Sequence, residues 1–138
     1  MTGVRARWRG LITEGDRGSA VVEFVLVSVL VVTIVAALLQ LVLGLHVRNT
    51  LVDSASEGAR HAALVGSTPA QGVARTRELI GMTLSPRYAR DVSASLVDRG
   101  GTTLVRVQVS APLPVLGLLG PSGVLDVSGH AVLEEALG

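Results

Sequence analysis

The longest apolar run in the chain extends from Phe24 to Leu45. It is interrupted only by the polar residues Ser28, Thr33 and Gln40. At about 1.5 Å per residue, a helix of this length covers a hydrocarbon core of about 30 Å. A secretory signal peptide has a shorter apolar region and ends in a small-residue cleavage site, which residues 44–46 (GLH) do not provide. The pattern therefore predicts a transmembrane helix at about residues 22–45.

The helical pattern continues beyond the apolar run. Small or apolar residues recur every three or four positions and would form one helix face, namely Leu51, Ala55, Ala59 and Ala62. We therefore expect one long helix over residues 19–64. Because these side chains are mostly small, this face can approach another element closely. The partner is either this protein's own domain or a neighbouring subunit.

A second helix is predicted after Gly66. Thr68 is placed to be its N-cap, Pro69 its first residue, and Gln71 the second half of a capping box. Its apolar stripe consists of Val73, Thr76, Ile80 and Leu84. The helix should end at Ser85, because the residue before Pro86 disfavours the helical conformation.

From residue 92 onward the periodicity changes to two, which indicates strands. A first strand around residues 92–97 and a second around 105–109 are separated by a turn signal at 98–101 (DRGG). Pro112 and Pro114 should end the second strand, because proline cannot donate to a central ladder. A third strand is expected within 124–133, with Gly129 as a candidate bulge.

These elements predict an α+β protein in which a long N-terminal transmembrane helix continues into a small domain. That domain, residues 65–138, would contain one further helix and a three-stranded antiparallel sheet. Because so small a domain is marginally stable alone, we expect the long helix to cover one sheet face.

The distribution of arginine predicts the orientation in the membrane. All 12 basic residues other than histidine are arginine. Arg5, Arg7, Arg9 and Arg17 precede the apolar run, whereas Arg48 and Arg60 follow it. This bias favours a cytoplasmic N-terminus, with residues 1–18 on the cytoplasmic side and residues 65–138 outside the cytoplasm.

A single carboxylate, Glu23, stands at the start of the apolar run. A charged residue at the centre of a bilayer costs roughly 2.5–3.5 kcal/mol on insertion scales, so such residues usually have a partner or a function. If the chain were cut between Gly18 and Ser19, Glu23 would be the fifth residue of the product, directly before Phe24. The alternative is an acid stabilised by the helix dipole in the first helical turn.

Two segments resemble the TadE-like family of pseudopilins, which belongs to the tight-adherence (Flp) pilus machinery. They are residues 18–26 (GSAVVEFVL) and residues 49–63 (NTLVDSASEGARHAA). The resemblance implies a pilin-like fold and cleavage of the leader after Gly18 by a prepilin peptidase. It also implies that the Glu23 carboxylate, next to Phe24, pairs with the new α-amine of a neighbouring pilin-like or Tad subunit.

No catalytic or metal-binding pattern is found in the sequence. The three histidines, His46, His61 and His130, lack metal-ligand spacing, no serine lies in a nucleophile-elbow motif, and the chain has no cysteine. The net charge of +1 gives no argument for nucleic acid. We therefore expect no enzyme activity, no cofactor, no metal and no small-molecule substrate.

Two functional interpretations remain. The first is a TadE-like minor pseudopilin, a single-pass membrane component that is processed and takes part in pilus assembly. The second is an extracytoplasmic binding module on a membrane anchor that is never cut. The apolar segment 113–120 (LPVLGLLG) fits packing on the core, contact with the membrane surface, or contact with a partner.

The first prediction concerns processing. We expect the mature chain to begin at Ser19, and Gly18→Leu to block trimming, because a bulky side chain would obstruct the narrow peptidase site that the resemblance implies. Peptide mass mapping of the protein from its native host measures this. Recovery of only the untrimmed N-terminus from wild type, with the peptidase present, would contradict the prediction.

Overall fold

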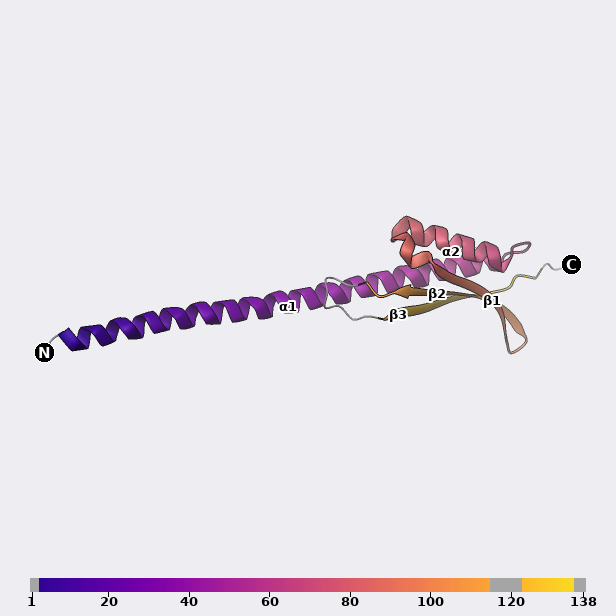
Figure 1. The fold of residues 1–138 in the computed structure, drawn as a ribbon. Helices are drawn as coiled ribbons and strands as arrows, with labels where there is room; N and C mark the ends of the chain where they lie inside the picture. Colours follow the sequence, from indigo (N-terminus) through magenta and orange to yellow (C-terminus); the bar gives the residue numbers. More distant parts are fainter. Residues whose placement is uncertain (1–2, 115–122, 136–138) are drawn as a thin grey trace. The chain divides into compact units, whose positions relative to one another are not determined.

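The computed structural model describes the backbone of residues 3–114 and 123–135, and the side chains of residues 16–114 and 123–135. The elements follow one another as a long helix α1 (Gly3–Ala63), a helix α2 (Pro69–Thr83), a 3₁₀ helix η1 (Pro86–Ala89) and three strands. The strands are β1 (Asp91–Arg99), β2 (Thr102–Pro112) and β3 (Val124–Val132), shown in Figure 1. The predicted α+β class is confirmed.

The chain divides into two compact units, Met1–Leu39 and Gln40–Gly138. The first contains the N-terminal part of α1, and the second contains the rest of α1 with every other element. α1 begins at Gly3 and is therefore longer than the expected 19–64. The added residues lack proline and include several good helix formers, notably arginine. The division into residues 1–18, 19–64 and 65–138 stays a prediction.

The sheet is antiparallel with the order β1-β2-β3, so β2 is central. Alternate β2 residues are buried, which gives the sheet an inner and an outer face. The buried β2 residues are Val105, Val107, Val109 and Ala111. The β1–β2 hairpin turns at Gly100 and Gly101, both with positive φ (63° and 84°), a conformation that glycine adopts without a steric penalty. The Asp98 carboxylate fixes the turn by accepting a hydrogen bond of 3.1 Å from the Gly101 amide.

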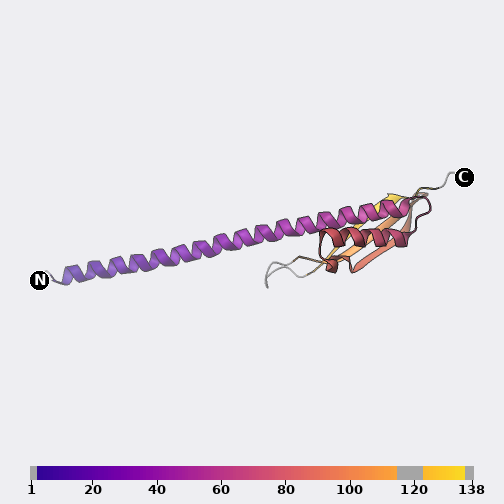
Figure 2. The ribbon, with the colours of Figure 1, turned by 90° about the horizontal axis from the view of Figure 1, so that it is seen from above.

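The helices of the second unit pack together and against the inner face of the sheet (Figure 2). α2 runs beside the C-terminal part of α1, and its predicted capping box is present. The Gln71 amide donates to the Thr68 hydroxyl at 3.3 Å, and the Thr68 amide donates to the Gln71 side chain at 3.0 Å. The main core cluster joins α1, α2, η1 and the sheet through Val47, Leu51, Ala55, Ala59, Ile80, Tyr88, Val92, Val107, Val109, Ala111 and Val127.

Gly129 is where the backbones of α1 and the sheet meet. The expectation of a bulge at Gly129 is wrong, because Gly129 pairs with Val107 in an uninterrupted register. A Cβ atom there would lie 2.3 Å from the Ser56 nitrogen and 2.5 Å from the Ala55 carbonyl carbon. The glycine is therefore required by the close approach of the helix and not by an irregular strand.

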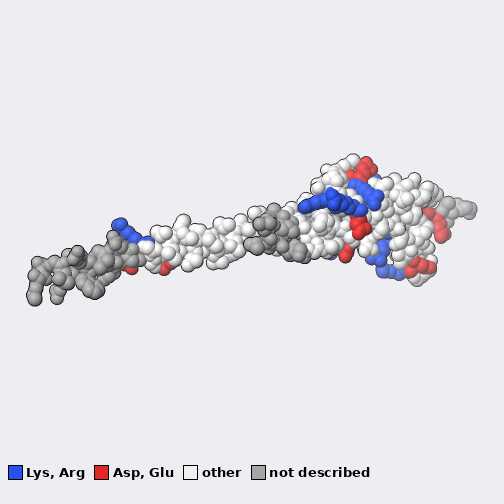
Figure 3. All heavy atoms as spheres, viewed as in Figure 1, with Lys and Arg blue, Asp and Glu red and all other residues white. Residues whose placement is uncertain are grey.

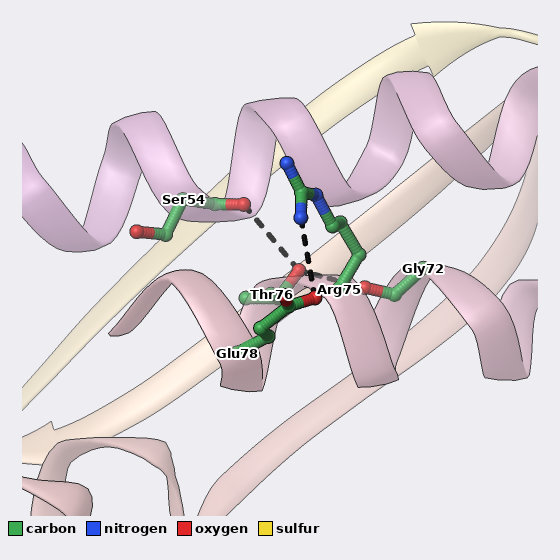
Figure 4. A network of polar contacts seen from close by, with 5 residues as sticks. All are labelled: Ser54, Gly72, Arg75, Thr76 and Glu78. Carbon is green, nitrogen blue, oxygen red and sulfur yellow. Dashed lines mark hydrogen bonds and ion pairs between the residues drawn. The ribbon is translucent and has the colours of Figure 1, made fainter. Parts of the chain in front are cut away.

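A second close approach joins α1 to α2 at Gly58 and Gly72. A Cβ on Gly58 would lie 1.8 Å from the Thr76 hydroxyl oxygen, and a Cβ on Gly72 would lie 2.6 Å from the Ala62 Cβ. The buried Thr76 hydroxyl lies within hydrogen-bonding distance of the Gly72 carbonyl at 2.8 Å and the Ser54 carbonyl of α1 at 3.4 Å (Figure 4). The contact therefore joins two helix backbones and satisfies the buried Thr76 hydroxyl.

The second prediction tests this contact. Gly58→Ala should lower the stability of the second unit by about 1–3 kcal/mol, because the new methyl group must push α2 away despite the gain in helix propensity. Gly81→Ala, on α2, is the matched control, since no atom lies within 4 Å of the position that a Cβ would occupy there. It should raise stability by roughly 0.5–1 kcal/mol.

Thermal unfolding of the full chain in detergent, followed by circular dichroism, measures both variants. A Gly58→Ala variant as stable as Gly81→Ala would contradict the proposed close packing.

Candidate functional site

The N-terminal part of α1 exposes an apolar surface on all sides. The helix residues Asp16–Ala63 include a stretch long and apolar enough to cross a membrane, and none of its most apolar window is buried within the protein. In Figure 3, charged side chains are visible near the start of the described part of this helix, and the surface that follows is uncharged. A helix that is apolar all round needs lipid or other apolar helices around it. α1 is therefore a candidate membrane anchor.

Two of the polar side chains within this apolar run have partners in the structure. The Thr33 hydroxyl donates to the Val29 carbonyl at 2.7 Å, one turn earlier in the helix. The Gln40 side-chain amide donates to the Pro114 carbonyl. Both arrangements reduce the cost of placing a polar group in an apolar medium, because the donor is paired within the protein.

Glu23 differs from these residues. Its side chain is exposed, and within residues 16–114 and 123–135 it has neither a hydrogen bond nor an ion pair. Its neighbour Phe24 is also 73% exposed. An unpaired carboxylate in an apolar medium is strongly penalised unless a counter-charge arrives from another molecule. The geometry thus leaves the Glu23 carboxylate available to such a partner.

The predicted cleavage residues Gly18 and Ser19 lie inside α1, less than two turns before Glu23 and Phe24. No atom lies within 4 Å of the position that a Cβ on Gly18 would occupy, so the helix is open there. Glycine in a helix interior costs about 1 kcal/mol relative to alanine. Gly18 is therefore a point at which the local helix is both accessible and weakened.

The predicted packing face of α1 is turned into the second unit. Leu51, Ala55, Ala59 and Ala62 are all buried and belong to its two core clusters. Ala62 packs in the smaller cluster with Ala63 and Val105. The contacts that these four side chains make are with this protein's own domain, so they are not available to a neighbouring subunit.

The sequence analysis did not anticipate an open groove of about 570 Å³ in the second unit, lined by Thr50, Asp53, Ser54, Ser56, Glu57, Arg60, Leu79 and Thr83. Within it, the Arg60 guanidinium and the Glu57 carboxylate lie 3.8 Å apart. Exposed pairs of this kind contribute little to stability. The spacing of Asp53, Glu57 and Arg60 on one helix face is the only signal of the groove in the sequence. Among the described residues, no group of three or more His, Asp or Glu side chains is placed to hold a metal ion.

The comparisons with known proteins bear on the N-terminal segment. Residues 18–60 match the family model of the TadE-like protein. The comparisons with curated proteins and with solved structures gave no match. The matched residues contain both segments from which the resemblance was drawn, apart from the last three positions of the second, and the match begins at Gly18. Over residues 18–60, which include the candidate membrane span, the chain is similar to the TadE-like family.

Proposed function

We propose that this protein is a TadE-like minor pseudopilin, a structural or assembly component of a tight-adherence (Flp) pilus or of a related secretion-like system. A prepilin peptidase cuts it between Gly18 and Ser19. Its α1 helix remains in the lipid bilayer and associates there with other pilin-like or Tad subunits. It acts through assembly, without a catalytic step, a cofactor or a small-molecule substrate.

The observation that carries this proposal is the Glu23 carboxylate on an exposed apolar helix, which has no partner within residues 16–114 and 123–135. It lies five residues after Gly18, the residue at which the family match begins. An acid that only stabilised the start of a helix would be expected in the first turn. In the uncut chain α1 begins at Gly3, so Glu23 lies deep within the helix and far from its N-terminal dipole. A cut after Gly18 would place Glu23 near a new helix N-terminus, so the dipole and a partner's amine would both favour the carboxylate in the processed chain.

Cleavage after Gly18 supplies the counter-charge. The new α-amine of Ser19 has a pKa near ~8 in its unperturbed state and is mostly cationic at neutral pH. In an apolar medium, an amine and a carboxylate from two subunits attract each other strongly, and each would be penalised if it were left alone. Processing therefore prepares the helix for association, because it creates the cation that Glu23 can bind.

The alternative is an uncut membrane anchor that carries an extracytoplasmic binding module. The continuous helix through Gly18 favours it, because nothing in the backbone marks a boundary there. In that case the N-terminus stays at Met1 and the polar groove beside Asp53 and Glu57 becomes the candidate binding surface. Intact mass and N-terminal sequencing of the membrane-extracted protein separate the two functions.

The third prediction concerns Glu23. Glu23→Gln preserves shape and hydrogen bonding but removes the charge, so membrane insertion and trimming should persist. Recovery of partner pilins should fall by about tenfold, the equivalent of roughly 1.4 kcal/mol, because the partner's amine loses its counter-charge. Crosslinking or co-purification at matched membrane levels measures this. Glu57→Gln, which also removes an exposed acid from α1 but lies outside the span, is the control.

Equal partner recovery for wild type and Glu23→Gln would reject the intersubunit pairing. A similar loss in Glu57→Gln would show that acidic charge in general, and not the position of Glu23, matters for association.

The fourth prediction concerns topology. We expect the second unit to lie outside the cytoplasm, as the arginine bias before the apolar run indicates. Ser95 is exposed on β1, and the chain has no native cysteine, so Ser95→Cys provides a single reporter. It should react with a membrane-impermeant maleimide in intact cells, or in spheroplasts where a wall or outer membrane shields it. Labelling only after lysis would show the opposite orientation.

A further inference from the structure

The backbone that connects β2 to β3 is fastened to α1 close to the sheet. We call residues 112–114 and 123–124 the β2–β3 neck. Its two sides are joined by a hydrogen bond of 3.1 Å from the Leu113 amide to the Gly123 carbonyl. Pro114 is buried, and its carbonyl accepts the hydrogen bond from the Gln40 side chain. The neck is thus held against one particular turn of α1.

That turn belongs to the apolar run for which we propose a membrane location. Residues 40–45 have two different sides. Leu43 and Gly44 are half-buried on the side of the protein, whereas Leu41, Val42 and Leu45 are exposed. If lipid surrounds the exposed side, the neck on the protein side lies at the same depth. Val124, in the neck, is 68% exposed, so a label at this position can report whether the neck meets lipid or water.

The polar backbone groups of the neck are suited to that depth. Non-helical backbone is tolerated within a membrane only where its N–H and C=O groups are paired inside the protein. Pro112 and Pro114 have no N–H group to pair. The Leu113 amide is bonded to Gly123, and the Pro114 carbonyl is bonded to Gln40. Among the described neck residues, the two prolines and these two hydrogen bonds lower the cost of placing this backbone in an apolar medium.

Three exposed arginines of the second unit could reach lipid phosphates, and one of them lies directly after the apolar run. Arg48, Arg87 and Arg90 are exposed. Arg48 comes three residues after Leu45, roughly 4–5 Å farther along the helix. Arg87 lies over the Tyr88 ring at 4.8 Å and donates to the Tyr88 hydroxyl at 2.8 Å. The ring is buried in the core cluster that also contains Val47.

The nearby acids face a different direction. Asp91 pairs in register with Ser110, which pairs with Asp126, so all three lie on the outer face of the sheet. Ser110 donates a hydrogen bond to Asp126. The arginine of η1 and the arginine of α1 are on elements that pack on the inner face. Long arginine side chains keep an apolar stem against the protein while the charged group reaches the headgroups.

We propose that the second unit docks on the phospholipid surface through the β2–β3 neck, which enters the bilayer at the depth of Gln40–Leu45, while Arg48, Arg87 and Arg90 contact lipid phosphates. This rests on the proposed membrane location of α1, but not on cleavage or on partner subunits. The second unit is then held at the membrane surface, and the apolar Val124 is covered by lipid.

The test uses single cysteines in the full chain, which has none of its own. Val124→Cys reports the neck, and Val132→Cys is its matched control, an exposed valine (57%) at the other end of β3. Ile34→Cys reports the apolar run. Each is spin-labelled in vesicles of zwitterionic and anionic phospholipid, and collisions with oxygen and with a water-soluble nickel chelate are compared. The ratio of the oxygen collision rate to the nickel-chelate collision rate should be at least about three times as large at residue 124 as at residue 132. The reason is that oxygen concentrates in the hydrocarbon, whereas the chelate is excluded from it.

The arginine contact has a second measurement. Anionic lipid should increase the ratio at residue 124, and Arg87→Gln with Arg90→Gln should abolish that increase. Arg99→Gln, an exposed arginine at the β1–β2 hairpin, should leave it unchanged. If residue 34 lies in hydrocarbon but residue 124 is as accessible to the chelate as residue 132, the proposed docking of the second unit is rejected, while the membrane location of α1 is retained. If residue 34 is also accessible to the chelate, the membrane location of α1 fails, and docking fails with it.

Discussion

The second unit depends on close contact between backbones at glycine positions, where no side chain keeps the two backbones apart. The α1 backbone at Ala55 and Ser56 lies against Gly129 of β3, and Gly58 lies against Gly72 and Thr76 of α2. Each position would be blocked by one additional methyl group. So small a domain can bury little apolar surface. It gains additional van der Waals contact by bringing helix and sheet closer than larger residues would permit. The alanines of α1 serve the same packing, since Ala55, Ala59 and Ala62 are all buried.

This packing is reinforced at both ends of the contact. Near the apolar run, the Gln40 side chain binds the Pro114 carbonyl. At the far end, the Glu134 amide donates to the Ala63 carbonyl at 2.9 Å and so satisfies a carbonyl at the C-terminus of the helix. The sheet is thereby fastened along α1 from residue 40 to residue 63. A domain held in this way cannot shift along the helix without breaking the contacts at the glycines.

α1 consequently has two functions that are separated along its length. Its C-terminal part is buried in the second unit and supplies one wall of a core. Among the described residues, its apolar run up to Leu39 is exposed and is preceded by one carboxylate, Glu23, whose side chain is unpaired. The first part supplies the core of the second unit, and the second part is a candidate membrane anchor. The family match spans this division, because it runs from residue 18 to residue 60.

The sequence by itself predicted the elements and the resemblance of residues 18–60 to the TadE-like family. The apolar run, the capping box at Thr68 and the alternation around Val107 depend on neighbours within a few residues, and for this reason local patterns predicted them. It did not determine why Gly58 and Gly129 are glycines, because each lies in close contact with atoms that are distant in the sequence. From local sequence alone, a bulge was the explanation offered for Gly129. The bond from Gln40 to Pro114 and the groove beside Glu57 were likewise beyond local patterns. The segment at 113–120 lies mostly outside the described residues, of which the structure includes only Leu113 and Pro114. Only tertiary structure decides such features, because the free energy of a close contact depends on which surfaces the whole fold brings together.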